Sequence, residues 1–88
     1  MKLRTSDVTW REIDGDLVVL DLRSSTYFTA NGAAGVLMKQ LAEERTDVQL
    51  QQSLVDEYGI AQSQAAEDVR AFLDDLERAG LLEQPVAG

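Results

Sequence analysis

The chain has 88 residues, of which 44% are apolar and 27% charged, a composition typical of one small folded domain. Sixteen acidic residues against eight basic ones give a net charge of -8. The electric field of this negative charge repels the phosphate backbone on which nucleic-acid affinity depends. Cysteine and histidine are absent, which excludes disulfides, thiolate nucleophiles and Cys/His zinc sites. We therefore expect no catalysis, no metal or cofactor, and no nucleic-acid partner.

Targeting signals are also missing from the chain. The first ten residues lack the apolar run of a signal peptide, and no stretch approaches the roughly 20 apolar residues of a membrane span. A cytoplasmic protein without a membrane partner is the expectation.

Three short runs of apolar and β-branched residues come first in the chain and predict three strands. The dipeptide Asp14-Gly15 tolerates the positive φ values of a tight hairpin, so residues 10–13 should pair antiparallel with residues 17–22. The run Thr26–Thr29 follows a short polar separator and is expected to fold back against the second strand.

Side chains alternate across a strand, so the second run should present one apolar face and one face that includes a carboxylate. We expect the wholly apolar face to point into the core. That face consists of Val18, Leu20 and Leu22, and the other consists of Leu17, Val19 and Asp21.

Helical periodicity begins after the third run. Asn31 is a candidate N-cap for a helix over residues 32–44. The sequence Thr46–Gln49 has the form of a capping box and predicts the start of a second helix, which Gly59 should end in a left-handed residue. The buried stripe of that helix is predicted to be Leu50, Leu54, Val55 and Tyr58.

A third helix is expected from Ser63, its candidate N-cap, to Gly80, its stop. Leu81, just beyond that stop, should contact Leu76 as in a Schellman motif. Residues 1–7 and the tail from Glu83 are predicted to be loosely held. The order of three strands before three helices indicates an α+β fold, with residues 1–88 as one domain and an ordered core at about residues 8–82.

Taken together, these segments resemble the PqqD-like proteins, also called RiPP recognition elements, in their order and spacing. Within that family the chain looks most like the stand-alone recognition subunit of lasso-peptide biosynthesis, and its end soon after the third helix fits that expectation. The segments that carry the resemblance are Val18–Leu22, Thr26–Thr29, Asn31–Gly35, Leu54–Tyr58, Val69–Leu76 and Ala79–Glu83.

The resemblance implies a winged helix-turn-helix-like fold and a binding function. In the family, the leader segment of a ribosomally made precursor peptide adds as a further strand to the third strand, in a cleft beside the third helix. The bound peptide is then delivered to a separate leader protease, with a cyclase as a further candidate partner. Strand addition of this kind uses the unpaired amides and carbonyls of an edge strand.

Carried over by position, the peptide-binding residues come from the third strand and the third helix. Tyr27 and Phe28 point to opposite faces, and alternation alone leaves open which of them lines the cleft. The helix stripe would equally serve as core, and Arg70 would equally serve as an i,i+4 partner of Asp74. The carried-over residues are Ser25, Thr26, Tyr27, Phe28, Thr29, Val69, Arg70, Phe72, Leu73 and Leu76.

Three other functions fit parts of the pattern. A PqqD-type peptide chaperone for a radical enzyme keeps the fold and changes the pathway. A winged-helix DNA-binding regulator keeps the helix arrangement, but residues 63–79 hold five acidic side chains against two arginines. A structural or antitoxin-like interaction domain predicts a protein partner without affinity for a short extended peptide.

Overall fold

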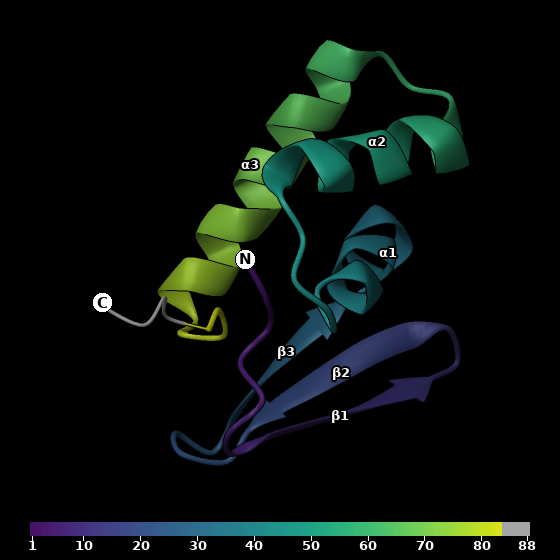
Figure 1. Ribbon diagram of the computed structural model, residues 1–88. Helices are drawn as coiled ribbons and strands as arrows, with labels where there is room; N and C mark the ends of the chain where they lie inside the picture. The colour runs from purple at the N-terminus through teal and green to yellow at the C-terminus, as the bar shows by residue number, and fades with distance from the viewer. Residues whose placement is uncertain (84–88) are drawn as a thin grey trace, which may run out of the picture.

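The computed structural model describes residues 1–83 and has three strands followed by three helices (Figure 1). The strands form one antiparallel sheet in the order β1-β2-β3, with the helices gathered on one side of it (Figure 1). The predicted α+β architecture is thereby confirmed. The elements are β1 Val8–Ile13, β2 Asp16–Asp21, β3 Thr26–Ala30, α1 Gly32–Gln40, α2 Asp47–Tyr58 and α3 Gln62–Arg78.

A two-residue turn joins β1 to β2, as the sequence predicted. Asp14 and Gly15 have φ values of 52° and 85°, the positive values that a tight hairpin requires and that glycine adopts at little cost. The register places Ile13 opposite Asp16 and Val8 opposite Asp21, so β1 is longer than the predicted run.

The face of β2 that points to the helices is the opposite of the predicted one. Leu17 and Val19 are buried together with Asp21, which is only 6% exposed. Leu20, by contrast, is 39% exposed on the outer face of the sheet, and Leu22, in the turn that follows β2, is 59% exposed. The prediction was wrong because it counted apolar side chains and assumed that a carboxylate would stay in water.

Burial of Asp21 is compensated by an ion pair with Arg4. The Nη2 atom of Arg4 lies 2.6 Å from Oδ1 of Asp21, and the backbone N–H of Arg23 donates to the same oxygen at 3.0 Å. Burial raises the pKa of Asp21, but these hydrogen bonds and the guanidinium charge outweigh it, so the pKa lies below its ordinary value. The carboxylate therefore stays charged inside the fold.

The segment before β1 is part of the fold, contrary to the expected loose segment. Leu3 is buried in the core. Its N–H donates to the carbonyl of Leu41, and the N–H of Arg4 donates to the carbonyl of Leu81. Glu83, expected to begin a loose tail, donates its N–H to the carbonyl of Lys2, and the rest of that tail lies outside the described residues.

Helix α1 is shorter than predicted, because it ends at Gln40. Asn31 occupies the N-cap position, but its side chain makes no capping hydrogen bond. Gly35 is buried, and a Cβ atom there would lie 3.6 Å from the carbonyl oxygen of Ala30. This is an ordinary van der Waals distance, so the packing of α1 against the end of β3 would also accommodate a methyl group at this position.

The signals for the ends of α2 were read correctly. Thr46 and Gln49 form the predicted capping box. The backbone nitrogen of Gln49 lies 3.1 Å from Oγ1 of Thr46, and the backbone nitrogen of Thr46 lies 2.9 Å from Oε1 of Gln49. Gly59 has a φ of 63° and ends the helix in the left-handed region. The inclusion of Tyr58 in the buried stripe was wrong, since its side chain is exposed at the last turn.

Helix α3 begins one residue before the predicted cap. Ala61 is the N-cap and Ser63 lies inside the helix, so the prediction of Ser63 as cap was wrong. The predicted end is confirmed: the N–H of Leu81 bonds to the carbonyl of Leu76 and the N–H of Gly80 to that of Glu77, which is the Schellman pattern.

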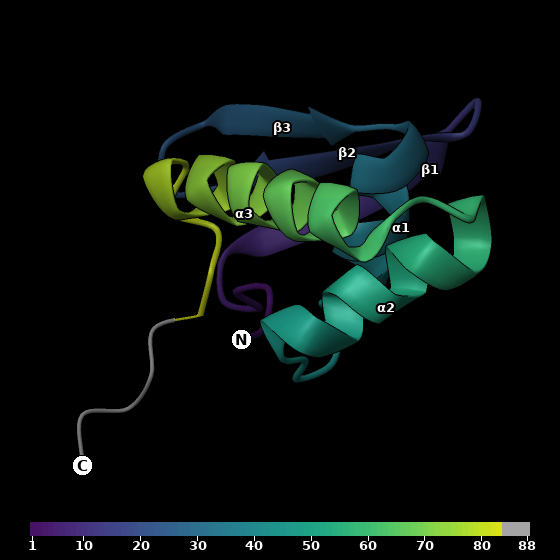
Figure 2. The same cartoon turned by 90° about the horizontal axis from the view of Figure 1, so that it is seen from above.

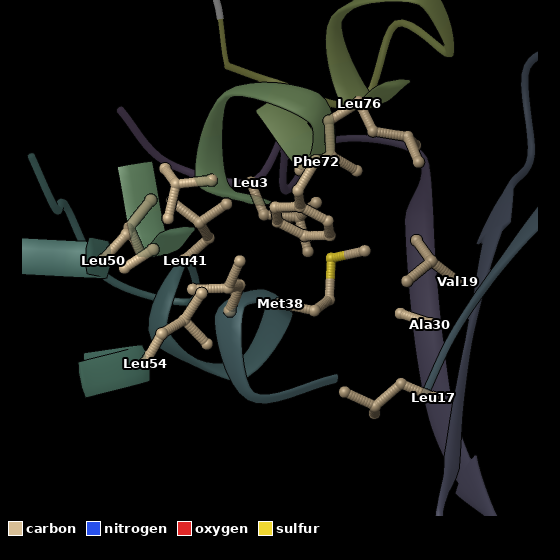
Figure 3. Close-up of a cluster of buried hydrophobic side chains, with 14 residues drawn as sticks. Leu3, Leu17, Val19, Ala30, Met38, Leu41, Leu50, Leu54, Phe72 and Leu76 are labelled. Atoms are coloured by element: carbon tan, nitrogen blue, oxygen red, sulfur yellow. The ribbon is translucent and has the colours of Figure 1, made fainter. Parts of the chain in front are cut away.

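The core lies between the sheet and the helices. Met38 occupies its centre, with side chains of the sheet on one side and side chains of the helices on the other (Figure 3). Within residues 1–83, no helix has the length and apolar character that crossing a bilayer requires. The buried hydrophobic residues are Leu3, Leu17, Val19, Ala30, Leu37, Met38, Leu41, Leu50, Leu54, Ala65, Val69, Phe72, Leu76 and Leu81.

The burial of Leu3 and the exposure of Leu22 are testable by truncating these two leucines. Leu3→Ala should lower the free energy of unfolding by about 2–5 kcal/mol, because it leaves a cavity in the core. Leu22→Ala, in the exposed turn that follows β2, should change it by no more than about 0.5 kcal/mol. Urea denaturation followed by circular dichroism measures both, and equal losses would contradict the assigned burial of Leu3 and exposure of Leu22.

The Arg4–Asp21 pair predicts a pH-dependent stability. Because the pKa of Asp21 is lowered by folding, its contribution is present above its unfolded-state pKa of about 3.9 and is lost as pH falls through the folded-state value. Asp21→Asn should therefore lower the melting temperature at pH 7, and this difference should shrink below about pH 4.

Thermal melts at pH 7, 5, 4 and 3 measure this difference. The exposed Asp74→Asn variant, which removes the same charge, is the control and should show little difference at any pH. If the difference in melting temperature between wild type and Asp21→Asn stays constant down to pH 3, the charge of Asp21 is not the cause of the stabilisation.

Candidate functional site

Strand β3 is an edge of the sheet and is free along one side. It pairs with β2 alone among the described residues. The segment Ser24–Ala30 contains no charged residue and no proline, whereas β1, at the other edge, carries Arg11 and Glu12. Charges and prolines are the usual protection of an edge against pairing, so β3 is open to the addition of another strand.

The register of β3 settles which aromatic side chain faces the helices. Phe28 lies opposite the buried Val19, on the helix side of the sheet, and is half-buried. Tyr27 lies opposite Leu20, on the outer face, and is 72% exposed. Phe28 is therefore the aromatic residue on the side of α3.

A small hollow is lined by residues of β3 and by residues at the C-terminal end of α3 and just beyond it. Seen from above, α3 runs along the direction of β3 (Figure 2). Four of the residues that line the hollow were missed by the sequence reasoning: Val19, Asp21, Ala79 and Leu81. The missed signal for Ala79 is its spacing of seven residues, about two helical turns, from Phe72. The hollow is lined by Val19, Asp21, Thr26, Tyr27, Phe28, Ala79 and Leu81.

The flank of α3 that ends at Ala79 can be followed back along the helix from its spacing. At 3.6 residues per turn, Asp68, Phe72 and Asp75 lie on the same line of the helix as Ala79. Phe72 is buried, whereas Asp75 and Ala79 are exposed and Asp68 is half-buried. By helical spacing, the flank of α3 that ends at Ala79 therefore carries one buried aromatic side chain and two carboxylates.

The other predicted helix residues lie elsewhere on α3. Val69 and Leu76 are fully buried, and Leu73 packs half-buried against the core. Arg70 is exposed and lies nine residues, or about two and a half turns, before Ala79, which places it on the opposite side of the helix. Of the five predicted helix residues, Phe72 alone shares the line of Ala79.

The charges on α3 also pair differently from the sequence reading. Arg78, and not Arg70, makes the ion pair of this helix, with its Nη2 atom 3.2 Å from Oδ1 of Asp75. The Nε atom of Arg78 donates to the carbonyl oxygen of Asp74 at 3.4 Å. Within residues 1–83 no three side chains of the metal-binding kinds come together as a cation site.

The strand side of the hollow is held in place by polar contacts around the turn between β2 and β3. Asp21, at the end of β2, binds Arg4 and accepts the N–H of Arg23. The hydroxyl groups of Ser24 and Thr26 lie 2.6 Å apart, and Ser25 has a φ of 57°. These contacts fix the point at which β3 begins beside α3.

Comparison with known proteins gives one family and two solved structures. The family model described as "Coenzyme PQQ synthesis protein D (PqqD)" matches residues 16–82. A structure described as "TbiB1 in Complex with the TbiA(beta) Leader Peptide" is 27% identical, covers 98% of this chain and 99% of its own, and has a TM-score of 0.86. No curated protein sequence matches the chain.

The second solved structure has the same overall shape. It is described as "Lasso peptide synthetase B1 complexed with the leader peptide", is 25% identical, and has a TM-score of 0.82. The alignment covers 94% of this chain and 96% of that one. Both similar proteins were therefore solved with a leader peptide, and each is similar over nearly its full length.

Proposed function

This chain belongs to the PqqD family, and from that premise we propose that it binds the leader segment of a ribosomally made precursor peptide by adding it as a strand to β3. Two structures that share its fold over nearly the whole chain are complexes with leader peptides. The observation that carries the proposal is the free, uncharged edge of β3 beside a hollow on α3. An extended peptide bound there would satisfy the unpaired backbone groups of the edge.

The residues proposed to contact the peptide follow from this geometry. The backbone of Ser25 to Thr29 would pair with the peptide, and alternate peptide side chains would point into the cleft. Phe28 and Phe72 would form its apolar floor and Ala79 its helix-side end. The core residues Val69, Leu73 and Leu76 would support the wall from beneath, while Arg70 would take no part.

The pathway proposed is lasso-peptide biosynthesis, with this protein as a non-catalytic adaptor. One similar structure favours it over a PqqD-type chaperone for a radical enzyme, because it is described as a lasso peptide synthetase B1 complexed with the leader peptide. The proposed partners are the precursor leader, a separate leader protease and, as a further candidate, a cyclase. The protein would contribute affinity and positioning, while the bond-breaking and bond-making groups would come from these enzymes.

The winged helix-turn-helix likeness belongs to the same proposal. In that interpretation, α2, the turn at Gly59 and α3 form the helix pair, and the β1–β2 hairpin takes the place of the wing. DNA binding is not favoured, because α3 would be the recognition helix and carries five acidic side chains against Arg70 and Arg78.

A synthetic leader peptide from the adjacent precursor gene, fluorescently labelled, should bind this protein alone. Fluorescence anisotropy should show saturation with the leader and none with a scrambled peptide of the same composition. Strand addition further predicts that single N-methylated amides weaken binding by about tenfold or more at alternate positions of the bound segment, because each methyl group removes one donor to the edge.

Two outcomes of this titration would count against the proposal in different ways. Absence of saturable binding by folded protein would contradict leader recognition itself. Binding that tolerates N-methyl groups at every position would retain recognition but contradict strand addition.

The position of the cleft is testable with two bulky substitutions on α3. Ala79→Trp should fill the hollow and weaken leader binding by about tenfold or more, a loss of roughly 1.4 kcal/mol. Arg70→Trp adds similar bulk on the opposite side and should leave the affinity within about twofold. Both sites are exposed, so circular dichroism should show folded variants. A loss confined to Arg70→Trp would place the peptide on the other side of α3.

A further inference from the structure

Helical spacing places two carboxylates of α3 on the same flank as Ala79, the residue at the end of this helix that lines the hollow beside β3. Asp68 and Asp75 are seven residues apart and lie on the line that also carries Phe72 and Ala79. Ala79 lines the hollow together with Thr26 and Phe28. Any strand added to β3 would therefore pass between this acidic wall and the edge.

The wall has little positive charge to balance these two groups. Asp68 accepts a hydrogen bond at 2.9 Å from the neutral side chain of Gln64. Asp75 pairs with Arg78, but the two side chains are 58% and 77% exposed, and ion pairs as exposed as this contribute little. No lysine or arginine occupies the line of residues 68, 72, 75 and 79.

The edge itself has no charge with which to select a partner. Edge strands are usually protected by lysines, prolines or bulges, and the segment Ser24–Ala30 has neither charge nor proline. The backbone of β3 would accept strands of nearly any sequence. Discrimination by charge therefore falls to the carboxylates of the neighbouring helix.

The spacing of the two carboxylates lies between one and two side-chain repeats of an extended peptide. Seven residues of helix advance about 10.5 Å along the axis. Side chains on one face of a strand repeat about every 6.8 Å. Lysine or arginine side chains at successive cleft-facing positions have the length and flexibility to reach both carboxylates.

Resting on the proposed leader binding, we propose that Asp68 and Asp75 make the cleft selective for a strand with lysine or arginine among its cleft-facing side chains. The same wall disfavours acidic strands. Charge complementarity at a partly solvated rim selects among partners more than it raises affinity. The substrate class is therefore an extended leader segment with basic residues at alternate positions.

The test is a lysine and glutamate scan of the same synthetic leader, measured by fluorescence anisotropy at low salt. Each position in turn is replaced by Lys and by Glu, and each pair is titrated with wild type, with the Asp68→Asn, Asp75→Asn double variant, and with Asp74→Asn. Asp74 adjoins Asp75 but lies on the far side of the helix relative to Ala79, so it controls for a change in net charge.

At one or two cleft-facing positions, wild type and Asp74→Asn should bind the Lys peptide about two- to fivefold more tightly than the Glu peptide. The double variant should bring this ratio close to one. Equal ratios in wild type and the double variant, or loss of preference in Asp74→Asn alone, would overturn the assignment. If the unsubstituted leader does not bind, the proposed function fails with it, whereas binding without a charge preference removes this inference alone.

Discussion

The ion pair between Arg4 and Asp21 is the contact on which the rest of the arrangement depends. It joins the N-terminal segment to the end of β2, with the Nη2 atom 2.6 Å from the carboxylate oxygen. The same carboxylate accepts the N–H of Arg23 and so fixes the turn that leads into β3. A buried pair of this kind contributes little net energy but is costly to break singly. Its main consequence is positional, because it determines where the free edge of β3 begins beside α3.

Structural features that depend on a few neighbouring residues were predicted well, whereas features that depend on a partner distant in the sequence were not. The turn at Asp14-Gly15, the capping box at Thr46–Gln49 and the stop at Gly80 depend on local backbone chemistry, which the sequence displays directly. The buried face of β2 depends on Asp21 finding Arg4, 17 positions earlier in a segment predicted to be loose. Nothing within β2 itself indicates that its carboxylate is neutralised.

The candidate site shows the same limit at the scale of one helix. Periodicity predicted the apolar stripe of α3, and the resemblance implied β3 as the edge that would bind the peptide, but neither fixes the rotation of the helix relative to the sheet. Val69, Phe72 and Leu76 are core, while Ala79, at the end of the helix, lines the hollow beside β3. A rotation of less than half a turn separates Ala79 from these core residues, and tertiary packing alone decides which of them are buried. The sequence reasoning therefore included Arg70 and omitted Ala79, although the two lie on opposite sides of the same helix.

In this small domain one helix contributes to the core and, in the proposed function, also to the peptide-binding cleft. A chain of 88 residues has a single small core. Helix α3 contributes four of its buried residues, and the flank beside them would form the wall of the proposed cleft. Because the core already fixes that flank, a peptide would meet a preformed surface and lose less affinity to ordering of the protein. Backbone pairing along β3 would then supply affinity that depends weakly on sequence, and the side chains of α3 would supply selectivity. Such a separation allows the peptide specificity to change by substitution on the exposed flank without disturbing the core beneath it.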